Sequence, residues 1–104
     1  MVDLQVNLQI QVDAERVTLE GDLSYKTVAE ALTKVIFASE APINKSVSID
    51  FAGVDHADSS GLALMVHWLR EAKKRNMFIQ FVNIPKKLIA LAEMSNLEDV
   101  LPIS

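Results

Sequence analysis

The stretch Asp55-His56-Ala57-Asp58-Ser59-Ser60-Gly61-Leu62 decides the fold, because it joins an apolar strand to the strongest helix in the chain. Before it, Val47–Phe51 is short, rich in β-branched residues and apolar at alternate positions, which is typical of a central strand. After it, Leu62–Lys74 is rich in helix formers and ends in cations, as a helix C-terminus prefers. Ligands and partners usually dock where the strands of a parallel sheet end, so we expect function at this junction.

The flanking sequence predicts further strands and helices, in the overall order β-β-α-β-α-β-α. Alternating apolar and polar residues over Val2–Val12, a turn at Asp13–Glu15 and renewed alternation over Arg16–Glu20 predict an antiparallel hairpin. The other predicted elements are a helix from Ser24 to before Pro42 with Val28, Leu32, Val35 and Ile36 on one face, a strand over Met77–Val82, a helix from Pro85 with Leu88, Leu91, Ala92 and Met94, and a short helical piece at Leu97–Leu101. Because βαβ crossovers return parallel, we expect one α/β domain over residues 1–104, with an N-terminal antiparallel hairpin, parallel central strands and helices packed on the mixed sheet.

Composition excludes several classes of function. The net charge of −4 argues against general nucleic-acid binding, which needs a basic face to neutralise phosphates. The absence of cysteine excludes disulfides and thiolate chemistry. Because no apolar run approaches the ~20 residues of a membrane span and the N-terminus is not signal-like, we expect a soluble, cytoplasmic protein without direct membrane insertion.

The sequence lacks the short motifs of common enzymes. It contains no GxGxxG, Walker lysine, CxxC or HExxH pattern, and Ser59 is not framed by the glycines of a nucleophile elbow. Its two histidines, His56 and His67, stand eleven residues apart without a cysteine, which does not predict a metal site. We therefore expect a non-enzymatic binding module with no cofactor.

Asp58, Ser59 and Ser60 allow two interpretations. As helix caps, their oxygens accept hydrogen bonds from the free N–H groups of the first helical turn. As a regulatory site, Ser59 would carry a phosphate that adds about −1.5 to −2 charges beside Asp55 and Asp58 and repels a docking partner. A third hypothesis, nucleotide binding at the helix N-terminus, is opposed by the same two carboxylates.

The helix after the junction is apolar on more than one side. At 100° per residue, a stripe predicted to face the core contains Leu62, Met65, Val66, Leu69 and Ala72. Leu64, His67 and Trp68 fall outside that stripe, and an exposed Trp beside Leu is typical of a binding hot spot. The alternative is that Trp68 lies at the flank and packs on a neighbouring helix.

The segment Val47–Leu62, with Asp50, Asp55 and the Asp58-Ser59-Ser60-Gly61-Leu62 corner, resembles the STAS family, the domain of anti-sigma-factor antagonists and of sulfate-transporter tails. That resemblance covers nearly the whole chain. It implies a corner that binds an anti-sigma serine kinase, with Ser59 at the position that the kinase phosphorylates.

The continuation over Gly61–Lys74, Leu91–Leu97 and Val100–Pro102 is similar to the MlaB branch of that family, the small STAS subunits of Mla phospholipid ABC transporters. This resemblance implies a subunit that binds and supports the cytoplasmic ATPase, peripheral to the inner membrane, and helps to maintain outer-membrane lipid asymmetry. The implied partner-binding residues are Asp58, Ser59, Ser60, Leu64, His67 and Trp68. The alternative is an anti-anti-sigma factor that Ser59 phosphorylation switches off.

Overall fold

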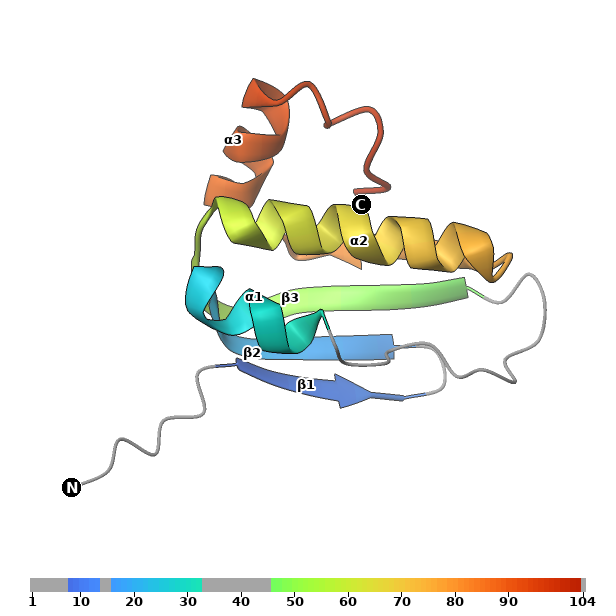
Figure 1. Ribbon diagram of the computed structural model, residues 1–104, viewed down its shortest axis with the longest axis horizontal. Coiled ribbons are helices and arrows are strands. Elements are labelled where there is room, and N and C mark those ends of the chain that lie inside the picture. The colour runs from blue at the N-terminus through green and yellow to red at the C-terminus, as the bar shows by residue number, and fades with distance from the viewer. Residues whose placement is uncertain (1–7, 14–15, 33–45, 104) are drawn as a thin grey trace.

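The computed structural model describes residues 8–13, 16–32 and 46–103 (Figure 1). The elements are β1 (Leu8–Val12), β2 (Arg16–Leu23), α1 (Tyr25–Ala31), β3 (Ser46–Ala57), α2 (Ser59–Lys74), β4 (Phe78–Val82) and α3 (Lys86–Met94). This order confirms the predicted β-β-α-β-α-β-α arrangement.

The strands form one mixed sheet in the order β1-β2-β3-β4. β1 and β2 are antiparallel, with Ile10 opposite Leu19, whereas β3 runs parallel to both β2 and β4. The hairpin and the parallel central strands are therefore as predicted. β3 is longer than the predicted Val47–Phe51, because it continues to Ala57 and leaves only Asp58 between the strand and α2.

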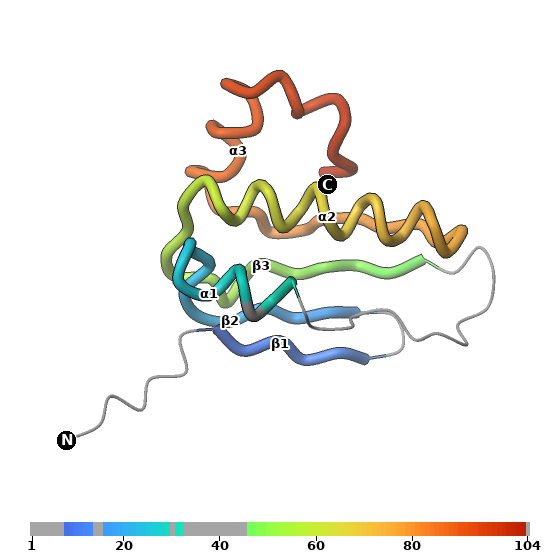
Figure 2. Tube along the Cα trace, viewed as in Figure 1, coloured from blue at the N-terminus to red at the C-terminus, as the bar shows by residue number. Residues whose placement is uncertain are grey.

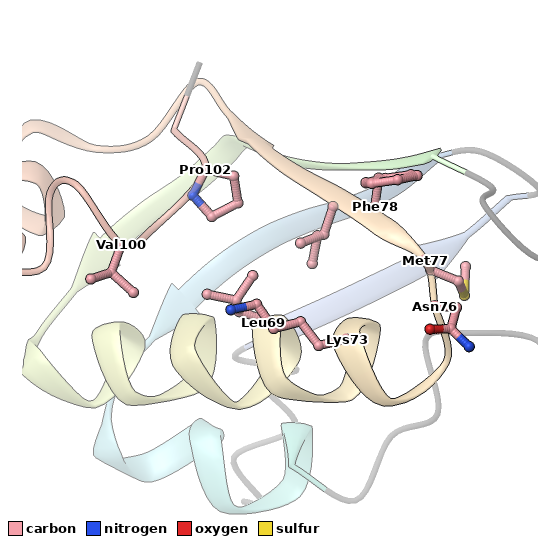
Figure 3. A pocket seen from close by; sticks show the side chains of 8 residues that line it. Leu69, Lys73, Asn76, Met77, Phe78, Val100 and Pro102 are labelled. Atoms are coloured by element: carbon pink, nitrogen blue, oxygen red, sulfur yellow. The ribbon is translucent and has the colours of Figure 1, made fainter.

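The helices α1 and α2 lie on the same face of the sheet (Figures 1 and 3). Alternate strand residues point into the core beneath them, including Leu19 in β2, Ile49 and Phe51 in β3 and Phe81 in β4, all nearly inaccessible to solvent. The rings of Phe51 and Phe81 meet edge to face, with centroids 5.9 Å apart. The opposite face carries mostly polar side chains, which are Gln9 and Gln11 in β1, Arg16, Thr18 and Glu20 in β2, Ser48 and Asp50 in β3 and Gln80 in β4.

The prediction that Leu64 and Trp68 lie on the outer surface of α2 is wrong, because their side chains are 0% and 1% exposed. For Trp68, this burial favours the alternative that it packs inside the protein. The buried residues of α2 span an arc of about 160° on a helical wheel, wider than the stripe that a sheet alone would cover. α1 packs beside α2, so α2 is covered by a second helix as well as by the sheet. His67 is half-buried, and Val66, expected in the core, is also only half-buried.

Smaller differences concern the ends of elements. Pro85 is the N-cap of α3 rather than its first helical residue, and Met94 at the helix end is 80% exposed. The predicted helical piece at Leu97–Leu101 is a hydrogen-bonded turn. The predictions for Val2–Asn7, for the turn residues Ala14 and Glu15 and for the part of the first helix that contains Val35 and Ile36 fall outside the described residues.

Candidate partner-binding site

Asp58 connects the starts of two helices. Its backbone N–H donates to the carbonyl of Leu23, the last residue of β2 (3.1 Å). Its side chain accepts from the N–H of Ser60 in the first turn of α2 (2.8 Å) and from the N–H of Tyr25, the first residue of α1 (3.1 Å). One carboxylate therefore caps both helices, which begin at the same end of the sheet (Figure 2).

These hydrogen bonds determine the protonation of Asp58. Burial alone would raise the pKa of this carboxyl, but the N–H groups of Tyr25 and Ser60, the Ser60 side chain and the charge of His56 favour the ionised form. The pKa of Asp58 is lowered as the net result. Each carboxylate oxygen of Asp58 is therefore already bound to a backbone N–H group of one helix.

The start of α1 has its own polar network. Ser24 accepts from the N–H of Lys26 (3.3 Å) and donates to a carboxylate oxygen of Asp22 (2.9 Å), while its N–H donates to the Thr27 hydroxyl (3.1 Å). The Ser24 hydroxyl thus caps the N–H of Lys26, and the Thr27 hydroxyl caps the N–H of Ser24. The network holds Tyr25 beside the start of α2.

Ser59 and Ser60 both lie in the first turn of α2, as predicted, but in different environments. Ser59 is exposed, whereas Ser60 is half-buried and donates its N–H to Asp58. The next residue, Gly61, lies where α2 comes closest to its neighbours, since a Cβ there would lie 3.1 Å from Leu23 and 3.3 Å from Leu88. The glycine lets the helix start close against β2 and α3, which leaves the Ser59 side of the turn facing outward.

The exposed side of α2 changes along its length. Ser59, Ala63 and His67 recur every four residues on one side, and the first two have small, exposed side chains. The C-terminal half instead exposes the long cations Arg70, Lys73 and Lys74. The N-terminal half therefore presents an uncharged surface of mostly small side chains beside the Asp58 corner.

Tyr25 is the neighbouring residue that the sequence analysis missed. Its side chain is 70% exposed, although a tyrosine is large enough to favour burial, and its N–H is bound to Asp58. The predicted helix begins at Ser24, but no local pattern places Tyr25 beside a residue 33 positions later. We call Tyr25, Ser59, Ala63 and His67 the corner surface. Of the predicted site residues, Ser59 and His67 lie on this surface, and Asp58 and Ser60 support it. Leu64 and Trp68 are buried residues of α2 and do not contribute to it.

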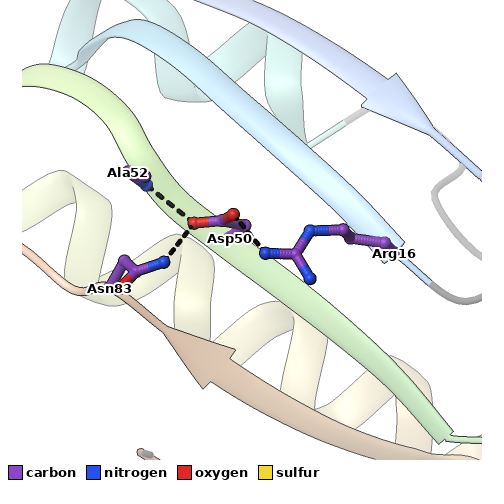
Figure 4. Close-up of polar contacts among 4 residues, drawn as sticks. All are labelled: Arg16, Asp50, Ala52 and Asn83. Atoms are coloured by element: carbon purple, nitrogen blue, oxygen red, sulfur yellow. Dashed lines mark hydrogen bonds and ion pairs between the residues drawn. The ribbon is translucent and has the colours of Figure 1, made fainter.

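A second polar cluster lies on the open face of the sheet (Figure 4). Asp50, 8% exposed, accepts from the side chain of Arg16 in β2, from the amide of Asn83 after β4 (3.0 Å) and from the N–H of Ala52 (2.9 Å). Burial raises the pKa of Asp50, but these donors outweigh that effect, so the pKa is lowered. The cluster links β2, β3 and the residue that follows β4.

The described residues carry no arrangement typical of a metal site or a membrane span. Within 8–13, 16–32 and 46–103, no three His, Asp or Glu side chains gather at a point that could hold a metal ion. No helix in those ranges is both long and apolar enough to cross a bilayer.

A mixed four-stranded sheet with helices on one face and a capped, hydroxyl-bearing corner between β3 and α2 defines a STAS-type domain. The family described as "Mlab, STAS domain" matches residues 6–102, and the chain belongs to this family. It is 31% identical over 98 residues to the intermembrane phospholipid transport system binding protein MlaB of Haemophilus influenzae, covering 90% of this chain and 93% of the relative.

Solved structures agree on the fold. The unphosphorylated anti-sigma factor antagonist SpoIIAA is similar with a TM-score of 0.67 and 20% identity, covering 93% of this chain and 85% of that one. A putative anti-sigma factor antagonist from Thermotoga maritima is similar with a TM-score of 0.64 and 16% identity, covering 92% and 84%. At these identities the likeness concerns the fold alone.

Proposed function

We propose that this chain is the STAS subunit of an Mla-type phospholipid ABC transporter and binds the cytoplasmic ATPase subunit through the corner surface. It carries out no catalysis itself. Its location is cytoplasmic, peripheral to the inner membrane through its partner, and it supports the transport that maintains outer-membrane lipid asymmetry. The proposal is supported by membership of the MlaB family and by similarity to a relative named for intermembrane phospholipid transport.

The observation that carries the proposed interface is the shape of the corner surface. Ser59 and Ala63 leave the first turns of α2 without long side chains, so a partner backbone can approach closely with little side-chain entropy lost. Tyr25 begins α1, its N–H is bound to Asp58, and its large side chain with a polar tip is 70% exposed. Tyrosine is enriched among the residues that contribute most to protein interfaces.

Leu64 and Trp68 keep an indirect role in this proposal. Because both are buried, they hold α2 in place and do not contact the partner. Asp58 and Ser60 act in the same way by fixing the start of α2 relative to α1. The contact itself is assigned to the corner surface.

Docking supports the ATPase only if the subunit binds one state of the ATPase more tightly than another. If the subunit binds the assembled nucleotide-binding dimer more tightly than the separate ATPase monomers, it shifts the equilibrium towards the dimer. Equal affinity for both states would leave the ATPase unchanged, however tight the binding.

A pull-down from the protein's native cells tests the choice of partner. We expect an affinity-tagged chain to recover an ABC ATPase together with its permease, as identified by mass spectrometry. Recovery of a small ATP-binding serine kinase without a transporter would contradict the proposal.

The second candidate is an anti-anti-sigma factor, which the exposed position of Ser59 directly after Asp58 favours. In that function Ser59 must be phosphorylated, whereas a transporter subunit needs this residue only for a close fit. Ser59→Ala separates the two candidates. If the chain is a transporter subunit, we expect Ser59→Ala to keep its affinity for the ATPase. If the chain is an antagonist, the Ser59→Ala variant should stay bound to its kinase, because the kinase can no longer release it by phosphorylation.

A further inference from the structure

A groove of about 450 Å³ lies at the other end of α2 from the corner surface (Figure 3). Its walls are the C-terminal half of α2, the start of β4 and the segment from Val100 to Pro102. Most of the lining is apolar, and Phe78 is 61% and Val100 55% exposed. Ser59 and Lys73 stand fourteen positions apart on one helix, about 21 Å, so the groove is a separate surface.

The groove contains one cation, Lys73. Figure 3 shows its side chain running back along α2 towards Leu69, so that the amine lies over the apolar lining. The neighbouring Lys74 pairs with Glu71 (3.3 Å), but none of the described residues forms an ion pair with Lys73. A ligand with a negative charge next to an apolar group would complement this lining.

The edge of β4 that borders the groove already accepts an extended segment. Ile103 pairs with Phe81 in a parallel bridge, and the Phe81 N–H donates to the Pro102 carbonyl (2.9 Å). Because backbone groups alternate along a strand, the N–H and C=O of Ile79 face the same edge. Pro102 has no N–H to offer, and no backbone group in the described part of the chain bonds Ile79 at this edge.

A second groove, of about 330 Å³, lies on the opposite face of the same edge. It is lined by Ser46, Ser48 and Gln80 on the open face of the sheet, and it shares Phe78, Ile79 and Pro102 with the first groove. Successive side chains of a strand point to opposite faces of a sheet. A short strand added beside Ile79 would therefore place alternate side chains in the two grooves.

We propose that the β4 edge binds an extended segment of a protein partner that carries an apolar residue and, two positions later, an acidic residue. The backbone of the segment pairs with Ile79. The apolar side chain enters the groove under α2, the acidic side chain meets Lys73, and the residue between them faces the second groove. This site goes beyond the proposed function and is independent of the corner surface.

Two other occupants fit less well. A fatty acid would complement Lys73 and the apolar walls, but it has no N–H to donate to the carbonyl of Ile79. A second copy of this chain would bring together two molecules of net charge −4, which repel each other. Both are outcomes that the experiment below distinguishes.

The test is an NMR titration of the ¹⁵N-labelled full chain with three blocked hexapeptides. The first has the sequence serine–valine–leucine–threonine–glutamate–serine, and the other two carry glutamine or lysine in place of glutamate. We expect saturable shifts at Ile79 and slower hydrogen exchange of its amide with the glutamate peptide, and roughly fivefold weaker binding of the glutamine peptide, as a partly exposed ion pair gives.

Variants assign the effect to the groove. Lys73→Glu should weaken binding of the glutamate peptide and strengthen binding of the lysine peptide, whereas Lys86→Glu, an exposed lysine on α3, should change neither. Ser59→Asp should also leave peptide binding unchanged, so that failure of this proposal and failure of the proposed function can be told apart. The proposal is overturned if no peptide saturates, if glutamate and glutamine peptides bind equally, if oleate displaces the peptide from Ile79, or if sedimentation shows a dimer that the peptide dissociates.

Discussion

Replacing Asp58 by alanine removes the cap of two helices at once, and the cost follows from its hydrogen bonds. A single N-cap contributes about 1 kcal/mol to the free energy of unfolding. Asp58 accepts from the N–H of Ser60 in α2 and from the N–H of Tyr25 in α1, with a different oxygen for each. We therefore expect Asp58→Ala to lower the free energy of unfolding by about 2 kcal/mol.

Asp58→Asn refines this prediction. An amide has one acceptor oxygen and a donor NH₂ group, so asparagine can accept from one of the two N–H groups but not from both. We expect it to lose about 1 kcal/mol, half the cost of the alanine variant. Asp58→Asn is therefore the matched comparison, because Ser24→Ala would remove the hydrogen bond to Asp22 together with the cap on Lys26.

The assay is equilibrium unfolding in urea, monitored by circular dichroism. The unfolding midpoints of the variants can be compared if their m-values are the same as that of the wild type. The reasoning would be refuted if Asp58→Ala cost no more than Asp58→Asn. That result would mean that the bond from Tyr25 to Asp58 adds nothing to stability.

Three further predictions concern the core and the sheet. Trp68→Ala should lower the free energy of unfolding by about 3–5 kcal/mol in urea titrations, because the ring is fully buried; a cost below about 0.5 kcal/mol would place it at the surface. Gly53→Ala should cost about 1–3 kcal/mol in the same titration, because the new Cβ would lie 2.8 Å from the Leu19 carbonyl oxygen; an unchanged midpoint would contradict that contact. Because the pKa of Asp50 is lowered on folding, its contribution to stability is present above the unfolded value near ~3.9 and is lost as the pH falls through the lower folded value. Urea titrations across that range should show the difference between wild type and Asp50→Asn shrinking with falling pH, and a constant difference would refute the assignment.

The strands and their order along the chain were predictable because each strand depends on local periodicity. The alternation along Arg16–Glu20 and the apolar run at Val47–Phe51 identify β2 and β3, and the parallel arrangement follows because strands joined by a helical crossover run parallel. The capping residues at the start of α2 were also recognisable, since Asp and Ser favour that position in any helix.

The exposed face of α2 was not predictable in the same way. Leu62 to Val66 are consecutive apolar residues, so a helical wheel alone does not show where the buried stripe is centred. The packing of α1 and α3 against α2 decides it. Tyr25 and Asp50 were missed because their roles depend on partners more than thirty positions away, which no local pattern encodes. The resemblance to STAS proteins identified the corner, but only the structure shows which of its side chains reach the surface.

The most direct test of the central claim compares the affinity of two arginine variants for the purified ATPase subunit of the cognate Mla-type transporter. Ala63→Arg places a long cation in the middle of the corner surface, while Ala90→Arg makes the same change at an exposed alanine on α3. By isothermal titration calorimetry we expect Ala63→Arg to weaken binding by about 2 kcal/mol or more, roughly thirtyfold, and Ala90→Arg to match the wild type. Equal affinities for both variants and the wild type would contradict docking through the N-terminal half of α2.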